Sequence, residues 1–99
     1  MSAKKLPEYD GKSLPFAIGD KIFIRTVTHH QVGKLIGIGV DFFVLANASW
    51  VADSGRFGDA LKNGTLNEVE KCPGPWCVVG RGGVIDIHPW DHDLPAATK

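Results

Sequence analysis

The residues best suited to bind a ligand lie in segment 76–88, where two β-branched runs are joined by a glycine-rich turn. Arg81 and Gly82 occupy that turn and present one cation on a tight backbone corner. A guanidinium offers a planar set of donors to a phosphate or a base edge, and a nearby aromatic ring would give an unpaired base a stacking surface. Asp41 and Phe42 follow another glycine-containing segment. Together these residues are a candidate site for single-stranded RNA.

The same residues also fit a purely structural role. Phenylalanine in a strand is buried more often than exposed, so Phe42 would then belong to the core. Arg81 would pair with Asp41 or Asp86 to hold the turn. The residue types alone leave both interpretations open.

Histidine and cysteine side chains raise the question of a metal site or a reactive thiol. His88 and His92 have a spacing that would suit two ligands on a helix, but Pro89 argues against a helix there. We therefore expect solvated histidines and no metal. Cys72 and Cys77 are not spaced like common redox or zinc pairs, so we expect reduced, structural thiols. With no recognisable nucleophile or phosphate-loop motif, we expect neither an enzyme nor a cofactor.

The composition indicates one small domain without a strong electrostatic field around it. The chain has 99 residues, with 11 basic and 11 acidic side chains. A net charge of zero does not attract a polyanion over long range, so any nucleic-acid binding would have to be local. No apolar run approaches the roughly 18 residues of a membrane span, and the first residues lack the apolar segment of a signal peptide. We expect a soluble, cytoplasmic protein that does not contact a membrane.

Apolar periodicity predicts an all-β domain with one short helix. The predicted elements are strands at 21–28, 32–40 and 42–51, a helix between Asp53 and Asn63, a strand at 66–80 that Cys72-Pro-Gly-Pro breaks or bulges, and a last strand at 84–87. Asp53 or Ser54 could cap the helix, and Asn63-Gly64 could end it.

Around the predicted domain at 21–88 we expect an N-terminal arm at 1–20 and a fraying tail at 89–99. The run 42–51 is apolar on both faces, so we expect it to be buried on both, partly by a neighbouring copy.

Two motifs between residues 22 and 87 resemble those of the Sm and Sm-like proteins. Gly33-Lys34-Leu35 and Val44-Leu45-Ala46-Asn47-Ala48 stand in the places of the first family signature, and Val78-Val79-Gly80-Arg81-Gly82-Gly83-Val84-Ile85 looks like the second. The two asparagines that RNA-binding members carry in these turns have no counterpart here.

The resemblance implies a small, strongly bent five-stranded barrel of the SH3 type, here with its short helix inserted between strands three and four. It also implies a ring of about five to seven copies, with single-stranded RNA bound at Asp41, Phe42, Arg81 and Gly82.

A second functional interpretation needs no RNA. Segment 48–57 resembles small proteins of tailed bacteriophages, so the chain could be a structural or accessory phage protein in a bacterial host. Trp50, Trp76 and Trp90 would then serve protein contacts. Both interpretations predict a homo-oligomer, because the last two strands leave edges that a closed ring would pair.

Overall fold

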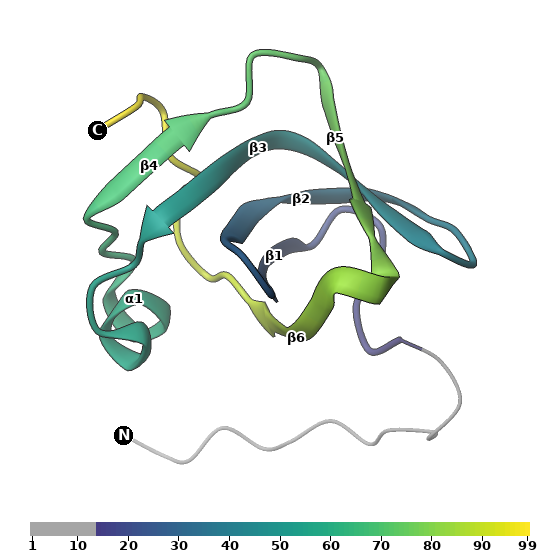
Figure 1. Cartoon of the computed structure of the whole chain (residues 1–99), viewed down its shortest axis with the longest axis horizontal. Helices are drawn as coiled ribbons and strands as arrows, with labels where there is room; N and C mark the ends of the chain where they lie inside the picture. Colours follow the sequence, from purple (N-terminus) through teal and green to yellow (C-terminus); the bar gives the residue numbers. More distant parts are fainter. Residues whose placement is uncertain (1–13) are drawn as a thin grey trace.

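The structure, a computed structural model, describes residues 14–99 (Figure 1). Its elements are β1 (Lys21–Thr26), β2 (His30–Ile38), β3 (Phe42–Asp53), α1 (Phe57–Asn63), β4 (Glu68–Lys71), β5 (Trp76–Gly80), the 3-10 turn η1 (Arg81–Gly83) and β6 (Val84–Pro89). The expected all-β character and the helix after the third strand are confirmed. Most of the N-terminal arm expected at 1–20 lies outside the described residues.

All strand pairs are antiparallel, in the order β4-β3-β2-β1-β6, with β5 also beside β3. Within residues 14–99, β5 and β6 do not pair with each other, so the sheet is not closed. Figure 1 shows β3 as the long curved strand, with β4 along one half and β5 along the other. Since β4 and β5 are separate, the sheet has six strands rather than the five expected.

A kink in β3 explains why its partner strand is split. Asn47 adopts a left-handed conformation with φ 51°, so the two halves of β3 run in different directions. Opposite this kink, the Cys72-Pro-Gly-Pro segment leaves the sheet, since proline has no N–H for the ladder. The Cys72 N–H still donates to the Ala48 carbonyl at 3.0 Å. The predicted break at this segment is confirmed.

The sheet is apolar on both faces, and each face has its own core. Successive residues of a strand point to opposite faces, so β1 serves both cores through Ile22, Phe23 and Ile24. The inner cluster consists of Ile22, Ile24, Leu35, Phe43, Leu45, Ala48 and Val79, with Leu14 and Phe16 packed against it. The outer cluster consists of Phe23, Val32, Val51, Ala60, Leu66, Val69 and Trp90, with Phe57, Leu61 and Leu94 at its margin.

The outer cover comes from the chain itself, through α1 and the segment after β6. The expected burial of 42–51 on both faces is wrong, because Phe42 and Trp50 remain 43% and 38% exposed. In the second half of β3, Val51 packs in the outer cluster under intramolecular elements, where we expected a neighbouring copy. Close packing of β2 on β3 requires glycine at Gly33, where a Cβ would lie 3.1 Å from the Leu45 Cβ.

The helix is shorter than predicted at its start. Its N-cap is Arg56, which makes no capping side-chain hydrogen bond, while the Asp53 carboxylate accepts the Gly55 N–H at 2.8 Å. The expected cap by Asp53 or Ser54 is therefore wrong, because Asp53 belongs to the end of β3. The predicted stop is confirmed, since Gly64 is left-handed with φ 75° and donates to the Ala60 carbonyl.

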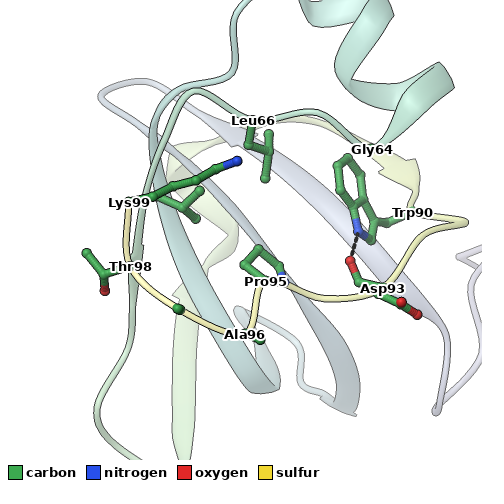
Figure 2. Close-up of a pocket in the computed structure, with 10 residues that line it drawn as sticks. Gly64, Leu66, Trp90, Asp93, Pro95, Ala96, Thr98 and Lys99 are labelled. Atoms are coloured by element: carbon green, nitrogen blue, oxygen red, sulfur yellow. Dashed lines mark hydrogen bonds between the residues drawn. The ribbon is translucent and has the colours of Figure 1, made fainter.

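The segment after β6, expected to fray, packs on the sheet instead. Trp90 is 2% exposed, its backbone N–H donates to the Lys21 carbonyl, and its indole Nε1 donates to the Asp93 carbonyl at 3.1 Å. Val69 and Lys99 exchange two backbone hydrogen bonds of 2.8 and 2.9 Å. Residues 95–99 arch past Trp90 (Figure 2), and these residues line a pocket of about 300 Å³. This segment closes the outer edge of β4.

Candidate functional site

The four predicted site residues meet where the β2–β3 turn approaches the β5–β6 turn. The Arg81 N–H donates to the Asp41 carbonyl at 2.9 Å, which joins the two turns through the backbone. Phe42 lies opposite Gly80 in the β3–β5 ladder, and Gly82 sits in η1. Residues 40 positions apart in sequence thus form one rim at this end of the sheet.

Phe42 is available on this rim, which contradicts the interpretation that it belongs to the core. Its side chain is 43% exposed, whereas the next residue, Phe43, is 3% exposed and part of the inner cluster. The Phe42 ring lies over Gly39, where a Cβ would come within 2.5 Å of the ring. Glycine at this position therefore gives the ring its place beside the turn.

Arg81 packs on Phe43 rather than on Phe42. Its guanidinium carbon lies 4.6 Å from the Phe43 ring centroid, a cation–π contact. The alternative pairing with Asp86 is wrong, because the Asp86 carboxylate binds Arg25 and His88. Among residues 14–99, no carboxylate lies within ion-pair distance of Arg81. A planar donor group thus stands beside an exposed ring and could meet a phosphate and a base.

Sequence reasoning missed a polar cluster on β1 and β6. Arg25 Nε donates to Asp86 Oδ1 at 2.7 Å, its Nη2 contacts Oδ2, and His88 Nε2 lies 2.9 Å from Oδ1. The hydrogen bond from Arg25, followed by that from His88, lowers the pKa of Asp86 to about 2. Arg25 also lies over the Phe57 ring at 4.5 Å. Through these contacts the cluster holds β6 and α1 against β1.

The histidines are engaged in internal contacts instead of being fully solvated as expected. His92 Nε2 donates to the Leu61 carbonyl at 2.7 Å, and His88 meets Asp86. His30 packs near Phe23, and burial lowers its pKa. Within residues 14–99, no group of three histidine, cysteine, aspartate or glutamate side chains is arranged to hold a metal ion.

The two strands with free edges carry exposed apolar side chains. Trp76 and Val78 on β5 are 66% and 63% exposed, and Ile85 on β6 is 60% exposed. Trp50 is also exposed, as a contact surface would require, but Trp90 is buried in the outer cluster. The prediction that Trp90 serves partner contacts is therefore wrong.

Comparison of the chain with protein-family models, curated proteins and solved structures finds no match in any of the three. In the part of the chain that the structure describes, no helix is both long and apolar enough to cross a bilayer.

Proposed function

We propose that the chain is a small Sm-like barrel of the SH3 type that assembles into a homo-oligomeric ring through the free edges of β5 and β6. The observation that carries the proposal is their pairing: within residues 14–99, β5 is paired only with β3, and β6 only with β1. An unpaired edge presents donors and acceptors that another strand can satisfy.

The strand order supports a barrel that is left open at one seam. β6, β1, β2, β3 and β5 form a continuous antiparallel series, and the three-residue turn η1 joins its two end strands. Register shifts in the β2–β3 pair bend the series. Because both ends of the series lie next to the same turn, the β5 edge of one copy could pair with the β6 edge of the next.

The side chains on these strands support association. Natural edge strands that stay unpaired commonly carry lysine, proline or inward charges. Here Trp76, Val78 and Ile85 expose apolar surface instead. Ile85 stands at a register shift in the β1–β6 ladder, where it is left without a partner residue. Pairing of copies would remove this surface from water.

Single substitutions at the two edges test the ring. We expect the unaltered chain to form a discrete oligomer at micromolar concentration, measured by mass photometry and light scattering. Val78→Lys and Ile85→Lys should each yield a monomer, because a charge on either edge opposes pairing. Ile18→Lys is the control, since Ile18 is 58% exposed and lies outside both strands. A monomeric unaltered chain would remove the proposal.

Mixing the two variants tests the geometry of pairing. In a head-to-tail ring, the Val78→Lys variant keeps an intact β6 edge and the Ile85→Lys variant keeps an intact β5 edge. The mixture should therefore form a heterodimer that grows no further. Homodimers of either variant alone would indicate that like edges pair, which would replace the ring with a two-fold assembly.

The surface of the chain favours a ring that binds other proteins. The chain has no net charge, Arg81 packs on Phe43, and the largest exposed side chain near the seam is Trp76. A ring with such contacts would act as a structural or accessory protein, for example that of a phage.

Single-stranded RNA is the second candidate, favoured by one observation: the exposed Phe42 ring beside the Arg81 turn. A ring would multiply one weak site by the number of copies. Labelled oligo-uridylate should then bind more weakly as salt rises, and Arg81→Ala and Phe42→Ala should each reduce binding. Lys34→Ala, an exposed cation elsewhere on the sheet, is the control. Absent binding, or binding that neither rim substitution changes, would exclude RNA at this rim.

A further inference from the structure

Cys72 and Cys77 stand at the two ends of the short link between β4 and β5. The Cys72 N–H donates to the Ala48 carbonyl, and Cys77 is the register partner of Leu45. Ala48 and Leu45 both belong to the inner cluster, and both cysteine side chains pack against that cluster. The two thiols therefore enter the same space from opposite ends of the loop at 73–75.

Cys77 Sγ donates to Gln31 Oε1 at 2.7 Å. Burial, together with the neighbouring Cys77 thiol, raises the pKa of Cys72. Both cysteines are free and neither is fully buried.

We infer that Cys72 and Cys77 are a dithiol that a low-molecular-weight disulfide, such as glutathione disulfide, converts into an intramolecular disulfide. The bond would tie the end of β4 to the start of β5, across the kink of β3. It would close a loop that already has its folded shape, so the oxidised chain keeps the same fold.

The reaction is a pair of thiol–disulfide exchanges. The Cys77 thiolate attacks one sulfur of glutathione disulfide, the S–S bond breaks, and one glutathione thiolate leaves. The Cys72 thiolate then attacks the Cys77 sulfur of this mixed disulfide, and the second glutathione leaves. The protein loses two electrons and two protons, and glutathione disulfide gains them as two thiols.

The surroundings of the thiols determine the order and the rate of these steps. Burial raises the pKa of Cys72 to about 11 and also raises the pKa of Cys77, while the neighbouring Cys72 thiol favours the Cys77 thiolate. Cys77 is therefore the first nucleophile. Because the pKa of both groups is raised above 9.0, both are thiols at neutral pH, and the rate should rise about tenfold between pH 7 and pH 8.

Mass spectrometry after incubation of the folded chain with glutathione disulfide tests the inference. The unaltered chain should lose two hydrogen atoms and retain no glutathione. Cys72→Ser should stop at a stable glutathione adduct on Cys77, and Cys77→Ser should form its adduct more slowly. A persistent adduct on the unaltered chain, disulfide-linked dimers, or no reaction at the highest pH would each overturn the inference.

Thermal melting tests the structural consequence separately. The oxidised chain should melt at a higher temperature than the reduced chain, because the bond restrains the unfolded chain. The variant with both cysteines replaced by serine should show no response to glutathione disulfide. A lower melting temperature after oxidation would contradict a bond formed without rearrangement.

Discussion

Replacing Trp90 with alanine tests whether the segment after β6 is part of the fold. The Trp90 side chain is 2% exposed, stacks on Phe23 with ring centroids 5.6 Å apart, and donates its indole N–H to Asp93. Truncation of such a buried tryptophan costs about 3–5 kcal/mol, because the lost contacts leave a cavity. Small domains have only about 5–15 kcal/mol of stability. The substitution should therefore remove much of it and lower the urea midpoint by about 2–4 M.

The assay is urea unfolding followed by far-ultraviolet circular dichroism, at a protein concentration too low for copies to associate. Trp76→Ala is the matched control, since Trp76 is 66% exposed, and we expect it to change stability by less than about 0.5 kcal/mol. If Trp90→Ala unfolds at the same midpoint as this control, the indole does not belong to the outer cluster, and our account of the segment after β6 fails.

Two glycines should respond in opposite directions to alanine in urea unfolding. Gly64→Ala should lose more than about 1 kcal/mol, because φ is 75° and the new Cβ would lie 2.7 Å from the His92 ring. Gly58→Ala should gain about 0.5–1 kcal/mol, because the site in α1 is open and alanine favours helix; a loss there would contradict the helix. Asp86→Asn tests the ion pair with Arg25. The pKa of Asp86 falls from 3.8 when unpaired to about 2 in the fold, so its carboxylate stabilises the fold above about pH 4. The stability difference from the unaltered chain should be constant there and close as pH falls towards 2; a difference that persists at pH 2 would assign the effect to packing.

The strands could be predicted from the sequence because a β-branched run acts on the backbone of its own few residues. β-Branched runs produced strands whose ends differ from the predicted ranges by at most two residues, and the proline-containing break after Lys71 appears where it was expected. Asn63-Gly64 ended the helix, since a left-handed residue there is a property of the backbone itself. The contact between the two rim turns was expected from the resemblance to the Sm-like proteins and not from a local pattern.

Features that depend on tertiary contacts could not be predicted from these patterns. Trp90 stands alone after Pro89, so no periodicity marks it as buried; its place depends on α1 and β1. Arg25 and Asp86 are 61 positions apart, and only the β1–β6 register brings them together. The assignment of Phe43 rather than Phe42 to the core depends on register, where a shift of one residue exchanges the two faces.

The kinked strand β3 contributes side chains to both cores, so the stability of one core depends on the other. Its first half supplies Phe43 and Leu45 to the inner cluster, and its second half supplies Val51 to the outer cluster. Separation of β3 from its partner strands would therefore expose both clusters to water. The domain should therefore open as a single cooperative unit, with amides of both halves of β3 exchanging their hydrogens at the same slow, global rate.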